Sequence, residues 1–175
     1  MKLLTLALSF VAVLSACGYQ PVHGAAGAKH LSVVLSASKV PDAVASDEVL
    51  AGVREELARA GALASGASYP RCEVEVLRMD ESAEGIAALP AEGAPLVPQA
   101  RATRVGLLAR AWIVESAGAE RERDTGDVRT FEIVATAPDA RGATFRHSDA
   151  LRAAGRRLGR RLASRIMGLP SPGDE

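Results

Sequence analysis

The chain has 175 residues, and its 21 lysines and arginines balance its 21 aspartates and glutamates, so the formal net charge is zero. This balance gives no argument for nucleic acid as a partner. The two cysteines, Cys17 and Cys72, are too few for a disulfide framework or a cysteine metal site, so we expect no bound metal and no cofactor.

The N-terminus has the pattern of an export signal. A positive start at Lys2 precedes an apolar run, Leu3–Leu14, which is too short to cross a bilayer as a helix, since that takes roughly 20 apolar residues. The run ends in Leu14-Ser15-Ala16-Cys17, which resembles the bacterial lipobox, where the cysteine becomes the first mature residue and its thiol receives a lipid. The alternative is an ordinary secretory signal or a buried N-terminal segment.

This interpretation divides the chain into four segments. Residues 1–16 form a lipoprotein signal peptide, 17–30 a lipidated tether of small residues, 31–169 a single α+β domain, and 170–175 a disordered tail. Gly18 follows the lipidated cysteine, whereas an Asp at that position is the common signal for retention in the inner membrane. We therefore expect the protein to be lipid-anchored on the periplasmic side of the outer membrane.

The domain begins with a predicted strand and a predicted helix. Residues 31–37 alternate in polarity, which is typical of a strand with Leu31, Val33 and Leu35 on one face. A helix is predicted over 47–60, with Ser46 capping its free amides and Gly61 ending it.

A second strand is predicted over 71–79, where Cys72 is expected to be a small buried apolar residue. Residues 80–100 predict an exposed loop, because they contain Pro90, Pro95 and Pro98. A third strand follows over 103–115 and a polar hairpin loop over 116–127. The fourth strand is predicted over 128–136, with Phe131 and Ile133 facing the core.

The last predicted element is a helix over 149–167, capped by Ser148 and ended by Gly168. Glycine is unfavourable inside a helix, so Gly155 and Gly159 indicate a close backbone approach to the sheet. The apolar stripe of the helix is Leu151, Ala154, Leu158, Leu162 and Ile166. Its polar side is either solvated surface or a contact for anionic lipid, and it carries Arg152, Arg156, Arg157, Arg160, Arg161 and Arg165.

The elements therefore follow the order strand, helix, three strands, helix. This order favours an α+β, two-layer sandwich, in which two helices pack on one face of a roughly four-stranded mixed or antiparallel sheet. The layout, the lipobox and the Cys17-Gly18-Tyr19 start together resemble the LptE family of lipopolysaccharide-assembly lipoproteins. The resemblance covers nearly all of the mature chain, although Ser36-Ala37-Ser38-Lys39 departs from a turn common in such proteins.

The resemblance implies an outer-membrane lipoprotein without catalytic activity. Such a protein sits inside the β-barrel LptD, supports the assembly of that barrel, and helps deliver lipopolysaccharide to the cell surface. Cys17 is the one family residue that carries over to this sequence. The alternative function is that of an auxiliary lipoprotein in another envelope transport system, or of an activator of cell-wall synthesis.

Arg104, Arg110 and Trp112 are the candidate ligand-binding residues, because they share one face of the third strand. Arginine forks suit phosphate, and a broad aromatic ring suits an amphipathic glycolipid. The alternative is that both arginines pair with acidic neighbours across the sheet.

An enzyme is not expected. The histidines, His23, His30 and His147, form no known catalytic pattern, and no glycine-rich phosphate loop follows a strand. Glu73 and Glu75 share a strand face and could form a carboxylate pair, but solvent-facing strand residues explain them more simply.

Overall fold

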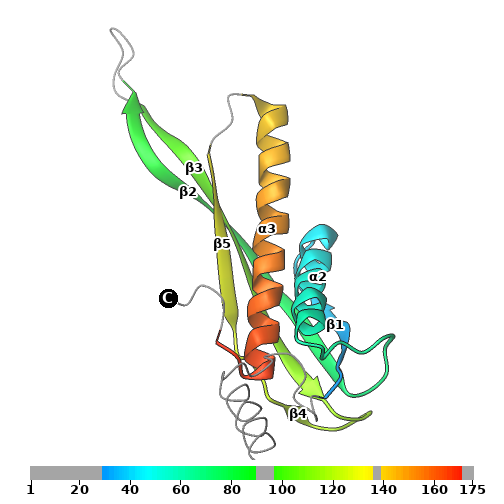
Figure 1. Ribbon diagram of the computed structural model, residues 1–175. Coiled ribbons are helices and arrows are strands. Elements are labelled where there is room, and N and C mark those ends of the chain that lie inside the picture. Colours follow the sequence, from blue (N-terminus) through cyan, green and yellow to red (C-terminus); the bar gives the residue numbers. More distant parts are fainter. Residues whose placement is uncertain (1–28, 90–96, 136–138, 171–175) are drawn as a thin grey trace, which may run out of the picture.

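The computed structural model describes residues 29–89, 97–135 and 139–170, which form one mixed sheet covered on one face by two helices (Figure 1). The elements are β1 (Ser32–Ser38), α2 (Ala43–Arg59), β2 (Arg71–Leu89), β3 (Val97–Val114), β4 (Arg121–Glu122), β5 (Val128–Ala135) and α3 (Ala140–Met167). The sheet order is β1-β2-β3, and both β4 and β5 pair with β3. Only β1 and β2 are parallel, so the sheet is mixed and the predicted α+β class is confirmed.

The two parallel strands are joined by α2, as parallel neighbours require a crossover connection. The helix begins earlier than predicted, because the Asp42 side chain accepts hydrogen bonds from the amides of Val44 and Ala45 at 2.8 and 3.3 Å. The prediction of Ser46 as the cap was wrong. Ser46 is buried within the helix, and its hydroxyl lies 2.8 Å from the hydroxyl of Ser38.

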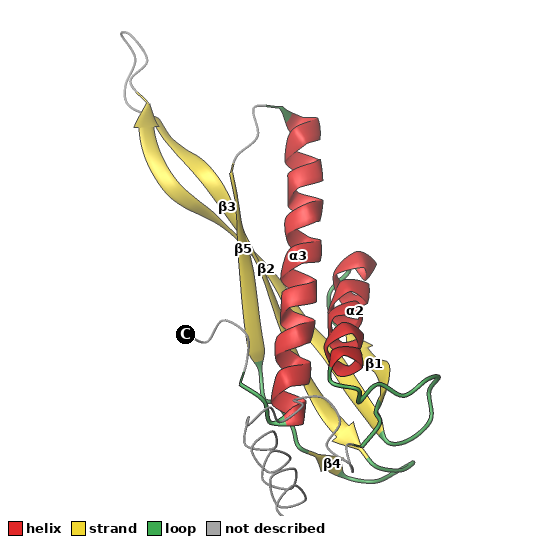
Figure 2. Cartoon of the chain, viewed as in Figure 1, coloured by secondary structure: helices red, strands yellow, loops and turns green. Residues whose placement is uncertain are grey.

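A long hairpin of β2 and β3 replaces the exposed loop that was predicted over residues 80–100 (Figure 2). The antiparallel ladder continues to the pair of Leu89 with Val97, and Pro98 pairs with Ala88. Proline lacks an amide hydrogen, yet it is tolerated in a strand where that donor is not needed by the ladder. Pro90 and Pro95 lie outside the described residues.

The predicted core face of β5 was also wrong. Phe131 and Ile133 are 48% and 58% exposed, whereas Val128 and Thr130 are buried beneath α3. The Thr130 hydroxyl donates to the carbonyl of Ala154 on α3 at 3.0 Å, which satisfies this buried polar group. Because side chains alternate along a strand, the burial of Thr130 places Phe131 and Ile133 on the opposite face of β5.

The last helix has the predicted buried face but a different start. It begins after Asp139, whose carboxylate accepts from the amide of Gly142 at 2.7 Å, so Ser148 lies inside the helix and is not its cap. Gly168 ends it in the left-handed conformation, at φ 71°. All five residues of the predicted apolar stripe are buried: Leu151, Ala154, Leu158, Leu162 and Ile166.

The helix glycines contact α2, not the sheet as predicted. A Cβ added to Gly159 would overlap the backbone of Val49 and Val53, and one added to Gly52 would overlap the backbone of Arg156. Successive contacts advance in the same direction along both helices, since Gly155 faces Ala45 and Gly159 faces Val49. The two helices are therefore parallel, and their backbones touch where side chains are absent.

Two further features concern burial. Cys72 is fully buried in the core, as predicted, and burial raises the pKa of its thiol to about 12, with the charge of Glu73 as a smaller cause. Within residues 29–89, 97–135 and 139–170, no helix is long and apolar enough to cross a membrane.

Candidate binding surface

The face of the sheet opposite α2 and α3 holds all three predicted ligand-binding residues. Arg104, Arg110 and Trp112 alternate with the buried residues of β3 and therefore share this face, as predicted. Arg104 and Arg110 are six residues apart, which is about 20 Å along a strand. The three residues consequently belong to two separate patches.

The lower patch is centred on Arg110, which binds its register partner Glu75. Its Nε and Nη2 donate to Oε2 of Glu75 at 2.8 and 2.6 Å, and Lys39 Nζ lies 3.0 Å from Oε1. Glu75 is only 7% exposed, so it is not the solvent-facing residue that the sequence predicted. The hydrogen bonds from Arg110, followed by those from Lys39, lower the pKa of Glu75, and the carboxylate in turn raises the pKa of Arg110.

Trp112 is covered and leaves no exposed ring for a ligand. It is 2% exposed, and its indole nitrogen donates to Oε2 of Glu73 at 3.2 Å. The guanidinium of Arg121, from β4, lies 3.8 Å from the ring centroid, and that of Arg110 lies 5.8 Å away. The Arg121 contact could not be predicted from the sequence, because β4 is only two residues long.

The upper patch is centred on Arg104 and contains exposed apolar side chains. Arg104 Nη2 lies 2.9 Å from Oε1 of Glu84, and its guanidinium lies 4.8 Å from the ring centroid of Phe131. Ile133 is the register partner of Arg104, and Gly106 is that of Phe131. Phe131 and Ile133 were predicted to lie in the core, because the register of β5 with β3 cannot be read from the sequence.

Both predicted arginines thus pair with acidic neighbours across the sheet, which was the alternative to direct contact with a ligand. An anion that binds Arg104 has to compete with Glu84, and one that binds Arg110 has to compete with the more buried Glu75. Arg104 is the more available of the two, because it lies beside the exposed Phe131 and Ile133. We call the surface formed by Arg104, Phe131 and Ile133 the outer patch.

The arginines of α3 mostly hold the helix against its neighbours. Arg156 Nε bonds Glu48 of α2 at 2.5 Å, which raises the pKa of Arg156, and Arg157 Nη2 lies 2.7 Å from Glu132 of β5. Arg160 lies 3.5 Å from Glu55 of α2, and Arg152 lies 3.2 Å from Asp149 within α3 itself. These contacts explain the arginine-rich face of the helix without a lipid.

Among the described residues, the other titratable groups considered in the sequence do not form a metal or catalytic site. The part of the chain that the structure describes holds no group of three or more His, Cys, Asp or Glu side chains able to bind a metal. His147 lies on α3 with its Nδ1 3.7 Å from Glu81, far from Glu73 and Glu75 on the opposite face of the sheet. Cys17 and His23 lie outside the described residues.

Comparison with solved structures shows which proteins share this fold. The fold is similar to that of a minor lipoprotein from Acinetobacter baumannii, with a TM-score of 0.52 and 13% identity over 81% of this chain and 92% of that one. Bacterial lipoproteins use this fold. A candidate lipoprotein from Caulobacter crescentus CB15 gives a TM-score of 0.50 at 10% identity, over 77% of this chain and 91% of that one.

A rare lipoprotein B from Shewanella oneidensis is a more distant neighbour, with a TM-score of 0.44 and 13% identity over 78% of this chain and 97% of that one. No protein-family model matches the sequence. A comparison with curated proteins also finds no match. At these identities the likeness to the lipoproteins shows the fold alone.

Proposed function

We propose that this chain is an outer-membrane lipoprotein, anchored through Cys17, that binds an LptD-like β-barrel and assists lipopolysaccharide assembly and delivery to the cell surface. The observation that carries this proposal is the lipobox-like Leu14-Ser15-Ala16-Cys17 sequence on a chain whose described residues have a fold also found in bacterial lipoproteins. No catalytic step is part of the proposal.

The outer patch is the proposed contact surface. Isolated exposed apolar residues are normal, but Phe131 and Ile133 lie together on the sheet face opposite α2 and α3. Arg104 adds a cation beside them, so the patch combines an apolar contact with a group that suits phosphate. Such a combination fits either the inner surface of a β-barrel protein or an amphipathic glycolipid.

The experiment is affinity purification of the full chain from crosslinked, intact cells. We expect an outer-membrane β-barrel to be recovered, and the purified chain to bind lipopolysaccharide less tightly as salt rises, because exposed charges are screened over about 8–10 Å at physiological ionic strength. Recovery of a transport complex or a cell-wall synthase in place of a barrel would favour the alternative function and contradict the family resemblance.

Substitutions test the patch separately from the partner. Arg104→Gln removes the charge without placing an acidic group against Glu84, and we expect it to weaken lipopolysaccharide binding. Arg110→Gln is the matched control, since Arg110 is engaged by Glu75 and should contribute little. Equal affinity for the wild type and the Arg104 variant, with the fold shown intact, would remove Arg104 from the binding site.

A further inference from the structure

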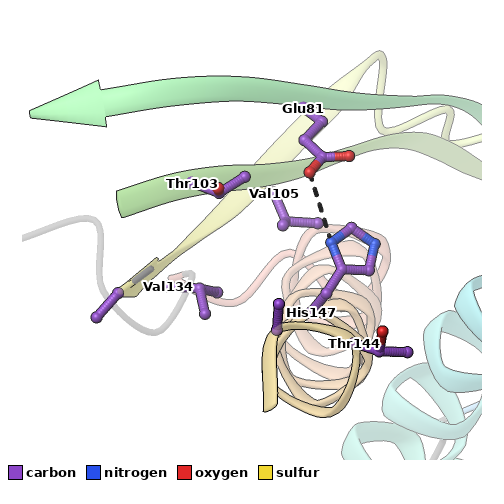
Figure 3. A pocket seen from close by; sticks show the side chains of 8 residues that line it. Glu81, Thr103, Val105, Val134, Thr144 and His147 are labelled. Carbon is purple, nitrogen blue, oxygen red and sulfur yellow. Dashed lines mark ion pairs between the residues drawn. The ribbon is translucent and has the colours of Figure 1, made fainter. Parts of the chain in front are cut away.

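A cavity lies on the other side of the sheet, between the sheet and the N-terminal part of α3 (Figure 3). Its volume is about 330 Å³, which is within the range of small-molecule sites. The residues that line it include Val105, Val134, Ala143, Thr103, Glu81 and His147. None of them belongs to the outer patch, so this is a separate site.

The cavity exists because the inward face of α3 changes in size along the helix. Toward the C-terminus this face carries Leu151, Leu158 and Leu162, which are buried against the sheet. Toward the N-terminus the residues of α3 that line the cavity are Ala143, Thr144 and His147, and none of them is buried. This part of α3 extends beyond the start of α2 (Figure 1), because the first turns of α2 lie beside Gly155. Among the described residues, α2 therefore does not cover the cavity.

The lining is mixed: Val105, Val134, Ala135 and Ala143 are apolar, whereas Glu81, Thr103, Thr144 and His147 are polar. Val105 lies beneath the cavity and is fully buried, whereas Val134 of β5 is half-buried and Ala143 of α3 is exposed, so the cavity is open to solvent. Glu81 and His147 face each other across the cavity in Figure 3, with 3.7 Å between Oε1 and Nδ1. That distance is too long for a hydrogen bond, so the carboxylate retains the capacity to accept one from a ligand.

We propose that this cavity binds one alkyl chain of an amphiphile whose head group is a hydrogen-bond donor, such as a hydroxyl or an ammonium. The chain occupies the space above Val105, and the head donates to Glu81. Burial of the methylene groups of the chain supplies the affinity. A carboxylate head is disfavoured because it places a second negative charge beside Glu81. The inference goes beyond the proposed function and relies on it only for the location of the chain at a membrane.

The test uses isolated envelope membranes that contain the full chain, detected by immunoblot before any labelling. The probe is a monoacylglycerol with a photoactivatable diazirine in its alkyl chain, and mass spectrometry locates the crosslinks. We expect crosslinks on the peptides that carry Val134 and Ala143. Absence of the chain from the membranes contradicts the proposed function, whereas a chain that is present but not crosslinked at these peptides contradicts the cavity assignment.

Ala143→Leu fills the cavity, and Ala153→Leu makes the same change on the solvent side of α3. We expect the first variant to lose crosslinking by about tenfold, which corresponds to roughly 1.4 kcal/mol, and the second to remain at the wild-type level. Thermal unfolding of both variants checks that the fold is retained. Equal crosslinking of the two variants, both folded, would overturn the proposal.

The head-group preference is tested with a second probe that carries a carboxylate in place of the glycerol. We expect the wild type to crosslink less of this probe, and Glu81→Gln to reduce the difference between the two probes. If the carboxylate probe labels the wild-type cavity as well as the glycerol probe does, Glu81 does not recognise the head, and the proposed ligand class is wrong.

Discussion

The Cys72 thiol combines full burial with a raised pKa of about 12. A thiol reacts as its thiolate, and the thiolate is the form that burial opposes. We therefore expect Cys72 to remain unlabelled by iodoacetamide in the folded protein at pH 8, and to be labelled fully in urea. Rapid labelling without urea would show that the core around β2 opens far more readily than its packing indicates.

Glu75 makes the stability of the fold depend on pH in the acid range. Its pKa is lowered in the folded protein, so the folded state binds this proton less tightly than the unfolded chain, where the usual value is 4.5. The stabilisation from Arg110 and Lys39 is complete above that value and is lost as the pH falls through the lower, folded value.

Glu75→Gln should accordingly be less stable than the wild type at pH 7, and the difference should shrink as the pH falls below about 4.5. Urea unfolding at several pH values measures this. Glu120→Gln, in the exposed loop before β4, is the control and should follow the wild type throughout. A difference that stays constant from pH 7 to pH 3 would mean that the carboxylate charge of Glu75 does not contribute.

The contact between α2 and α3 has its tightest points at Gly52 and Gly159. Replacing a glycine inside a helix with alanine normally stabilises by up to about 1 kcal/mol. Gly159→Ala should instead destabilise, by about 1–3 kcal/mol, because its Cβ overlaps the backbone of Val49 and backbone cannot move aside as a side chain can.

Gly155→Ala is the matched comparison, one turn earlier on the same helix. Its Cβ would lie 3.0 Å from the Cβ of Glu48, a contact that a small shift can relieve, so we expect a smaller loss of stability. Thermal unfolding ranks the two variants. The close contact of the helices would be contradicted if Gly159→Ala were as stable as the wild type.

Among the secondary-structure elements, the ends of the strands and the directions of their faces were predicted least well from the sequence. Three prolines made residues 80–100 resemble a loop, although antiparallel pairing carries β2 to Leu89 and starts β3 at Val97. For β5, apolar and polar residues occur on both faces, so hydrophobicity favoured Phe131 and Ile133 as core. The register with β3 and the hydrogen bond of Thr130 to α3 decide the face, and neither can be read from one strand alone.

At the scale of the whole molecule, the buried stripe of α3 and the order of the elements were predictable because periodicity reports them directly. The exception is β4, which lies within the hairpin loop predicted over 116–127 and is too short to show a period. The predicted site was only partly recognisable. Arg104, Arg110 and Trp112 share a face, as alternation requires, but their partners Glu84, Glu75 and Arg121 come from other strands. Sequence alternation places side chains on a face and leaves cross-strand pairing undetermined.

The lipid anchor is also a property of the whole molecule, and it stays a prediction because Cys17 lies outside the described residues. Cys17→Ala should leave an unprocessed precursor and abolish labelling with a fatty-acid analogue, since the thiol is the group that receives the lipid. Gel mobility and metabolic labelling measure both effects. A variant that is labelled as strongly as the wild type would rule out a lipoprotein.

The parallel pairing of β1 with β2 bears on the order in which the chain acquires its structure. The β2–β3 hairpin joins neighbouring segments, whereas β1 meets β2 only across α2, and α2 meets α3 across about a hundred residues. Contacts between distant segments form late, because closing long loops costs entropy first. If the chain is exported N-terminus first, as we propose, it exposes β1 and α2 before their partners have arrived, and we expect a chaperone to shield this stretch.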